Sequence, residues 1–246
     1  MYHGFGRRPR DADPHNLFVP AADLERQLDM VARYLRPLDL DGFLAGLGRR
    51  RWPGRSVLVT IDDGYASTLD VAAPLLAGRG IPAVVFVCPG VLGGTSAWMQ
   101  EMPGEPLLDA DGVRALGEYG IEVASHGLDH TLLPGLPPEQ LREQVEGSAA
   151  RLADLLGSRP RVFAYPEGRF DEAAARAVRE AGYEAAFSVT ERDGRFGVPR
   201  RGVTARDSAL VFAAKLLPGF DRVERLSVGS PKVRRLAARA LRQRPR

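Results

Sequence analysis

Two adjacent carboxylates, Asp62 and Asp63, are the first candidates for chemistry in this chain. They lie in the stretch VLVTIDDGY, residues 57–65, where an apolar run is followed by two acids and a glycine. Neighbouring side chains of a strand point in opposite directions, so at least one of the two acids must lie at the edge of the sheet. The carboxyl ends of parallel strands are where α/β proteins place ligands and catalytic groups. The same residues also favour an ordinary turn, so this motif alone leaves both interpretations open.

A second cluster contains His126 and His130, which follow another apolar run in IEVASHGLDH, residues 121–130. The chain has only four histidines, and a separation of four residues lets two imidazoles face one ion if the backbone turns between them. A single histidine is more often a surface or satisfied core residue. Two histidines and an aspartate, however, match the sites that bind catalytic zinc, iron or cobalt. The pattern predicts a metal site at the edge of a parallel sheet.

Three motifs, in this order along the chain, resemble those of the polysaccharide deacetylases, the NodB-like carbohydrate esterases of family four. They are TIDDG at residues 60–64, SHGLDH at residues 125–130 and FAYPEGRFD at residues 163–171. The resemblance covers residues 1–205. It implies a distorted (β/α)7 barrel of the α/β class. It also implies a hydrolase of amide bonds that removes N-acetyl groups from an amino sugar in a polysaccharide or glycan.

The resemblance implies roles for the residues of the first two motifs. One divalent ion is expected to be bound by Asp63, His126 and His130. Zinc is the default ion, and iron, cobalt and nickel are alternatives. Asp62 is expected to be the catalytic base that accepts a proton from the attacking water. The expected cofactor is therefore a single metal ion, and the expected partner is a carbohydrate.

The acid that protonates the leaving amine is expected at the N-terminus. Most members of the family carry this histidine in a final Leu-x-His motif, but no histidine follows His130 here. A circularly permuted branch, which includes the poly-N-acetylglucosamine deacetylases, carries it at the front, and this chain begins MYHGFG. The resemblance to that branch makes His3 the catalytic acid. The alternative is a terminal residue without a role.

The third motif departs from the common family pattern. Ala164 stands where many relatives have an arginine that orients the base. Relatives with this variant often carry an arginine on a later strand, which makes Arg200 the candidate, with a solvated surface arginine as the alternative. A backbone N–H in the segment Tyr165, Pro166 and Glu167 is expected to stabilise the oxyanion. Glu167 replaces an aromatic residue that is common in relatives, which leaves the shape of the sugar pocket open.

Composition favours one domain with a single large core. A chain of 246 residues with 44% hydrophobic residues is long enough for an α/β barrel. The only cysteine, Cys88, excludes an internal disulfide and is expected to be a buried structural thiol. No segment has the pattern of a bilayer span or a leader peptide. The sequence as written therefore predicts a cytoplasmic protein, and a start upstream of Met1 would allow an extracytoplasmic location.

Strands and helices are expected to alternate. The expected strands are residues 56–61, 83–88, 121–125, 161–165 and 185–189, and the expected helices are residues 22–35, 38–47, 67–78, 109–119, 138–157 and 172–182. Strands that are separated by single helices pair in parallel through right-handed crossovers. All three motifs are therefore expected at one edge of the sheet.

Residues 89–106 form a long connection rich in glycine and proline. Long loops of this kind often cover an active site. Trp98 in this loop has two interpretations, an aromatic platform that binds a sugar ring or an anchor for the loop itself.

Residues 206–246 are predicted to form a basic helical extension of the catalytic domain, residues 1–205. Residues 222–246 contain nine Lys or Arg and one acid, Glu224. This charge favours peripheral contact with an anionic membrane or an acidic glycan, and the alternative is a solvated tail. Nucleic acid is not expected, because no binding motif or aromatic interleaving accompanies the charge.

Two other functions stay open at the level of sequence. One is a deacetylase or deformylase of a lipid-linked or nucleotide-linked sugar, and the other is a catalytically silent glycan-binding relative. The second is disfavoured because all four residues of the first two motifs are intact. The size of the glycan, the choice between N- and O-acetyl groups and the oligomeric state are not determined by the sequence.

Overall fold

The structure is a computed structural model that describes residues 1–9, 11–49, 51–100, 104–189, 194–217 and 220. Contacts divide the chain into two compact units, Met1–Arg206 and Asp207–Arg246. All three motifs lie in the first unit. That the first unit is the catalytic domain and the second a basic extension stays a prediction.

Short strands and helices alternate along the first unit. The strands are β1 (Gly4–Phe5), β2 (Phe18–Val19), β3 (Arg36–Pro37), β4 (Ser56–Val57), β5 (Val59–Ile61), β6 (Ala83–Val87), β7 (Ile121–Ser125), β8 (Val162–Ala164), β9 (Ala185–Ser188) and β10 (Val198–Pro199). The helices are α1 (Ala21–Tyr34), α2 (Leu40–Arg49), α3 (Ala73–Ala77), α4 (Ala110–Ala115), α5 (Pro138–Arg142), α6 (Ser148–Leu156) and α7 (Glu172–Glu180). Short 3-10 turns are Leu116–Tyr119, Pro166–Gly168 and Gly194–Phe196, and wider π-type turns are Thr68–Ala72 and Glu143–Gly147.

The helices form where an apolar stripe and a capping residue coincide. In α1, the side chains of Leu24, Leu28 and Val31 are buried, at the spacing of four and three residues that places them on one face. Helix α7 begins after Asp171, whose carboxylate accepts a hydrogen bond of 2.8 Å from the N–H of Ala174. This bond satisfies one of the N–H groups that have no partner inside the helix.

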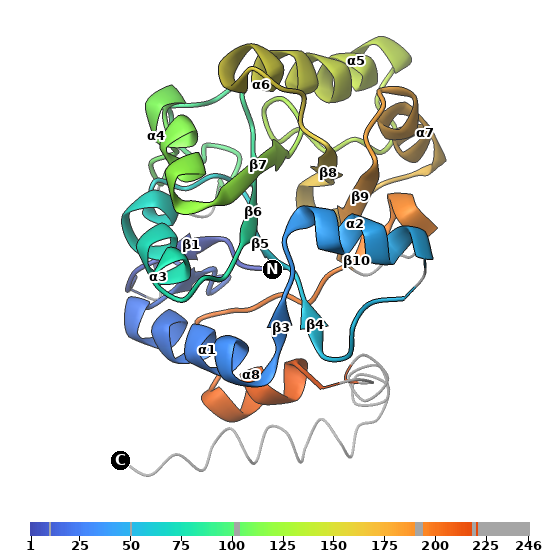
Figure 1. Cartoon of the computed structure of the whole chain (residues 1–246). Coiled ribbons are helices and arrows are strands. Elements are labelled where there is room, and N and C mark those ends of the chain that lie inside the picture. The colour runs from blue at the N-terminus through green and yellow to red at the C-terminus, as the bar shows by residue number, and fades with distance from the viewer. Residues whose placement is uncertain (10, 50, 101–103, 190–193, 218–219, 221–246) are drawn as a thin grey trace, which may run out of the picture. The chain divides into compact units, whose positions relative to one another are not determined.

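The main sheet is parallel throughout and curls. Its strand order is β10-β9-β8-β7-β6-β5. At each edge of this order, backbone hydrogen bonds join the sheet to the first two residues of the chain. At the β5 edge, the N–H of Tyr2 donates to the carbonyl oxygen of Thr60 (2.8 Å), and the N–H of Asp62 donates to that of Tyr2 (2.9 Å). After β10, the N–H of Val203 donates to the carbonyl oxygen of Met1 (2.8 Å), and the amino group of Met1 donates to that of Arg201 (2.9 Å). The sheet therefore curls until residues 1–2 lie between its two ends (Figure 1), and the predicted α/β class is confirmed.

The two faces of the curled sheet are covered by different helices. One core cluster joins Phe163 of β8 to residues of α5, α6 and α7. A second cluster joins the neighbouring residues Val162 and Ala164 to Leu40 and Leu44 of α2. Successive side chains of a strand point to opposite faces, so α2 covers one face and α5 to α7 cover the other (Figure 1).

Four expected elements are divided in the structure. The helix predicted at residues 67–78 is the π-type turn Thr68–Ala72 followed by α3, and the helix predicted at residues 109–119 is α4 followed by the 3-10 turn Leu116–Tyr119. The strand predicted at residues 56–61 is two strands, because β4 pairs with β3 in a separate sheet while β5 pairs with β6 in the main sheet. The helix predicted at residues 138–157 is divided by the turn Glu143–Gly147 between α5 and α6. An apolar run predicts that a segment is buried. Where that segment divides depends on the strands that pair with it, and these lie elsewhere in the chain.

The described part of the second unit contains one helix, α8 (Ala209–Lys215). Ser208 caps it by accepting a hydrogen bond of 3.3 Å from the N–H of Val211, and Lys215 forms an ion pair of 2.6 Å with Asp207. The basic helix predicted within residues 222–246 lies outside the described residues. Where the chain is described, none of its helices combines the length and apolar character that crossing a membrane requires.

Candidate metal centre

Parallel pairing brings the residues that follow several strands to one edge of the sheet. Strand β5 ends directly before Asp62, β7 directly before His126, and β10 directly before Arg200. Tyr2 forms a parallel bridge with the last residue of β5. The register of this bridge places the next residue, His3, beside Asp62.

Three side chains come together as candidate metal ligands: Asp63, His126 and His130, all of them buried. The Nε2 atom of each histidine lies 3.4 Å from Oδ1 of Asp63. Two ligands of a tetrahedral zinc ion, each about 2.0–2.1 Å from the metal, are about 3.3 Å apart. A direct N–H···O hydrogen bond has a length of about 2.7–3.2 Å. The spacing therefore fits three ligands around one ion better than hydrogen bonds between the side chains.

The charges of the three groups also suit a cation. Burial opposes ionisation of Asp63, but the imidazoles of His126 and His130 outweigh burial and hold its pKa well below the ordinary value. The carboxylate is thus negative at neutral pH, as a metal ligand must be. One carboxylate and two imidazoles are a donor set that zinc accepts, as do iron and cobalt in open sites.

The sheet fixes the orientation of His126. Its Nδ1 atom lies 2.7 Å from the carbonyl oxygen of Ala164, so a proton on Nδ1 is donated to this carbonyl. In the neutral ring, Nε2 then carries no proton and faces Asp63. A carbonyl that binds the second nitrogen in this way is the usual support of a metal-binding histidine.

Backbone strain is concentrated in the same region. The backbone angle φ is 72° at Asp63, 69° at His130 and 54° at Glu167. This left-handed conformation costs a residue other than glycine about 1–3 kcal/mol. Among the described residues, five that are not glycine adopt it, and three of these are predicted site residues. Such strain persists where surrounding contacts hold it, which is common at functional sites.

Arg200 holds Asp62 with both arms of its guanidinium group. The Nη1 atom lies 2.6 Å from Oδ1, and Nη2 lies 2.7 Å from Oδ2. The guanidinium carbon also lies 5.2 Å from the ring centre of Phe86 and 5.6 Å from that of Phe187. Burial raises the pKa of Asp62, but the charge of Arg200 leads the opposing effects, which leave it below the ordinary value. Arg200 is therefore a buried partner of Asp62 and not a solvated surface residue.

His3 lies close to both aspartates. Its Nδ1 atom is buried and has no hydrogen-bond partner among the described residues. Burial lowers the pKa of His3, and the charges of Asp63 and Asp62 offset this only in part. The N-terminal histidine thus belongs to the site region, while its role as catalytic acid stays a prediction.

The third motif leaves one main-chain donor for an oxyanion. The N–H of Tyr165 donates to the carbonyl oxygen of Phe187 (3.0 Å), and its hydroxyl donates to the carbonyl oxygen of Phe196 (2.9 Å). Pro166 has no N–H. Of the three residues predicted for this role, Glu167 is therefore the one whose N–H can serve.

Trp98 stacks on a candidate ligand. Its ring centre lies 4.5 Å from that of His130, with 10° between the two planes. It also packs against a cluster that contains Phe18 and Tyr65. These contacts favour the interpretation of Trp98 as an anchor of the loop, with His130 as part of what it holds.

Tyr65 was not predicted as a site residue. Its side chain is buried, and its hydroxyl group has no hydrogen-bond partner among the described residues. Burial and the charge of Asp63 raise its pKa, so the hydroxyl keeps its proton. Its position directly after the TIDDG motif is the only feature of the sequence that pointed to it.

Cys88 is buried, as predicted. Its Sγ atom lies 3.3 Å from the carbonyl oxygen of His126 and donates a hydrogen bond to it. Burial raises the pKa of this thiol well above its ordinary value. The thiol is therefore protonated and supports the loop that carries His126, which excludes it as a nucleophile.

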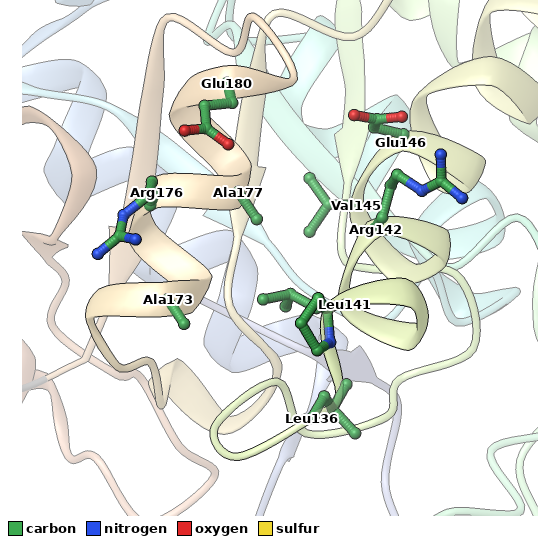
Figure 2. A pocket seen from close by; sticks show the side chains of 10 residues that line it. Leu136, Leu141, Arg142, Val145, Glu146, Ala173, Arg176, Ala177 and Glu180 are labelled. Atoms are coloured by element: carbon green, nitrogen blue, oxygen red, sulfur yellow. The ribbon is translucent and has the colours of Figure 1, made fainter.

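A surface hollow lies between α5, the turn that follows it and α7. It is apart from the candidate metal ligands. Figure 2 shows the apolar side chains of Leu136, Leu141, Val145, Ala173 and Ala177 with charged side chains around them. The charged residues are Arg142, Glu146, Arg176 and Glu180. None of the predicted site residues lines this hollow.

A sequence profile of the polysaccharide deacetylase family matches residues 49–186. The match covers more than half of the chain, and the chain belongs to this family. The Bacillus subtilis protein YxkH, named for the same family, is 27% identical over 140 residues, which are 57% of this chain and 46% of YxkH. The chain thus matches less than half the length of YxkH.

Solved structures show the same fold. IcaB from Ammonifex degensii is 27% identical and superposes with a TM-score of 0.74 over 87% of this chain and 94% of that chain. The Streptococcus pyogenes deacetylase PplD, solved with acetate, superposes with a TM-score of 0.77 over 89% of this chain and 96% of that chain. Its identity of 19% supports similarity of fold alone.

Proposed function

We propose that this protein is a metal-dependent hydrolase that removes N-acetyl groups from an amino sugar in a glycan. Membership in the polysaccharide deacetylase family supports the reaction class. The observation that carries the proposal is the spacing of 3.4 Å between Asp63 Oδ1 and the Nε2 atoms of His126 and His130, with the charged Asp62 next in sequence.

We also propose that the curled sheet is the (β/α)7 barrel of the family. This proposal is supported by the backbone hydrogen bonds that join residues 1–2 to β5 at one edge of the sheet and to the segment after β10 at the other edge. In this arrangement, the N-terminal segment takes the position of a barrel strand and carries His3 to the same edge as the two aspartates.

Asp63, His126 and His130 would hold the ion. When bound, a divalent ion supplies a Lewis acid that polarises the amide carbonyl and lowers the pKa of water to about 7. Asp62 accepts the proton of the water that adds to the carbonyl carbon. Arg200 orients Asp62 and keeps it ionised before this transfer.

The remaining groups act on the oxygen and nitrogen of the amide. The N–H of Glu167 donates a hydrogen bond to the carbonyl oxygen as negative charge develops there. His3 donates a proton to the nitrogen as the carbon–nitrogen bond breaks. The products are acetate and the free amine of the sugar.

The test is acetate release by zinc-loaded protein over N-acetylglucosamine oligomers, acetylated sugar nucleotides and lipid-linked sugars. We expect activity on the oligomers. Asp62→Asn should keep the ion and lose turnover by about 100-fold or more, because the amide has the same shape but cannot accept a proton. His126→Ala should lose the ion. Metal that stays bound in His126→Ala, or turnover that survives in Asp62→Asn, would contradict the assigned roles.

The same panel separates the alternatives. Activity confined to nucleotide-linked or lipid-linked sugars would assign the enzyme to that substrate class. Oligomer binding without acetate release from any substrate would identify a silent glycan-binding relative.

A further inference from the structure

We propose that Gln144 is a positioning residue for the loop of residues 126–130, and that it holds the two histidines in the arrangement that binds the ion. This inference rests on the proposed metal site. Gln144 lies outside the three motifs, on the π-type turn Glu143–Gly147 between α5 and α6. Wide turns of this kind are frequent at functional sites.

The side-chain amide of Gln144 forms hydrogen bonds with Leu128 and Asp129, two of the three residues between His126 and His130. The N–H of Leu128 donates to Oε1 of Gln144 (2.9 Å), and Nε2 of Gln144 donates to Oδ1 of Asp129 (2.8 Å). Gln144 is only 7% exposed, and its bond to the N–H of Leu128 is buried, so water does not readily replace that bond. Loss of the Gln144 amide would leave the N–H of Leu128 without its acceptor and Asp129 without its donor, so this side chain restrains both residues.

The opposite side of the loop is held by Gly90. Its N–H donates to the carbonyl oxygen of Leu128 over 2.6 Å. A Cβ atom at Gly90 would lie 2.6 Å from the same oxygen, so only glycine permits this approach. Leu128 is therefore fixed through its N–H by Gln144 and through its carbonyl by Gly90.

The loop needs these contacts because its last residue is strained. The angle φ is 69° at His130, a left-handed backbone that costs a residue other than glycine free energy, whereas Gly127 adopts its φ of 80° without strain. A relaxed loop would turn the imidazole of His130 away from Asp63 and break the spacing of the ligand atoms. Loss of the two hydrogen bonds should therefore weaken binding of the ion.

The experiment measures the zinc dissociation constant of the full chain by competition with a chelator. Gln144→Met keeps the length of the side chain and removes both hydrogen bonds. We expect its zinc affinity to fall about 10–100-fold, the range found when a residue that supports metal ligands is lost. Saturating zinc should restore most of its acetate release, because the bound ion itself then orders the histidines.

Gln27→Met is the matched control. Gln27 is 3% exposed and accepts a hydrogen bond of 3.1 Å from the hydroxyl of Tyr2, and in the described part of the chain no side-chain hydrogen bond joins it to the loop. The control should lose thermal stability to a similar degree and keep the zinc affinity of the wild type. Gln144→Glu is a second variant in case Gln144→Met does not fold. It keeps an oxygen that accepts from the N–H of Leu128, but it replaces the donor to Asp129 with a carboxylate that repels the Asp129 carboxylate. It should also weaken zinc binding.

The outcomes separate this inference from the proposed metal site. Wild-type protein that binds zinc, together with Gln144 variants of equal affinity, would overturn the role of Gln144 alone. An equal loss of affinity in Gln27→Met would attribute the effect to general destabilisation and would also overturn it. Wild-type protein that does not bind zinc would overturn both the proposed metal site and the role of Gln144 in positioning its ligands.

Discussion

Arg200 determines whether Asp62 can serve as the proposed base. A carboxylate that is buried without a partner takes up a proton and can no longer accept one from water. The two hydrogen bonds from Arg200 keep Asp62 charged, although the third motif has Ala164 where many relatives have an arginine. The positive charge therefore comes from the end of another strand.

The first prediction concerns the pH dependence of activity. Activity that needs ionised Asp62 is lost as the pH falls through the pKa of this group, which is below the ordinary value in the wild type. Arg200→Met removes the neighbouring charge and should raise that pKa, so the acidic limb of kcat/KM should move to higher pH. Arg200→Lys keeps the charge and should move it less. Profiles at saturating zinc that coincide for all three proteins would contradict the pairing.

The second prediction concerns His3. If it protonates the leaving amine, His3→Ala should lower hydrolysis of acetamides about 100-fold or more and leave zinc binding nearly unchanged. Activated esters should suffer much less, because their leaving groups need no proton. Rates on amide and ester substrates provide the measurement. Equal losses on both would indicate a collapsed N-terminal segment, and full activity on amides would place the acid elsewhere.

At the scale of elements, the turn Pro166–Gly168 presents the N–H of Glu167. Gly168 has a φ of 68°, and a Cβ atom there would lie 2.7 Å from the backbone nitrogen of Val189. The turn thus needs glycine for two reasons, its left-handed backbone and its contact with the segment after β9. Gly157 has a φ of 75°, but nothing lies within 4 Å of its Cβ position.

This pair of glycines yields the third prediction. Gly157→Ala should cost about 1–2 kcal/mol of unfolding free energy, the cost of a left-handed alanine. Gly168→Ala should cost more and should also lower turnover, because the clash displaces the N–H of Glu167. Urea unfolding and acetate release are the measurements. Equal destabilisation of the two variants with unchanged turnover would show that the turn tolerates the extra atom.

Sequence patterns anticipated the elements better than their boundaries. The buried stripe of α1 and the apolar run of β6 lie where they were expected, because periodicity and composition are local properties. The division of residues 56–61 into β4 and β5 was not anticipated. It depends on the pairing of β4 with β3, and no local pattern records which strand is the neighbour.

At the scale of the whole molecule, the two units allow the predicted domain division to be tested. The fourth prediction is that a chain ending at Arg206 folds and binds zinc with the affinity of the full chain, since all candidate ligands lie in the first unit. The full chain, with nine basic residues between 222 and 246, should bind anionic vesicles. The shorter chain should not.

Cosedimentation with vesicles that contain anionic lipid measures this difference. Attraction between exposed charges is screened within about 10 Å at 0.1 M salt, so binding of the full chain should weaken as salt is added. Vesicles of neutral lipid are the control. Equal binding of both chains, or binding that salt does not affect, would contradict a role of the basic residues.

The sequence by itself determined the family, the α/β class and the set of residues expected around a metal ion. These follow from short motifs at strand ends, where a few neighbouring residues carry the whole pattern. The tertiary structure decided which distant groups support them. The resemblance named Arg200 as a candidate and left a solvated surface arginine as the alternative, and the structure pairs it with Asp62 across 138 residues of sequence. Trp98 stacks on His130 from a different loop. Such contacts depend on how the sheet curls and how loops pack, and these are set by the whole chain rather than by any segment of it.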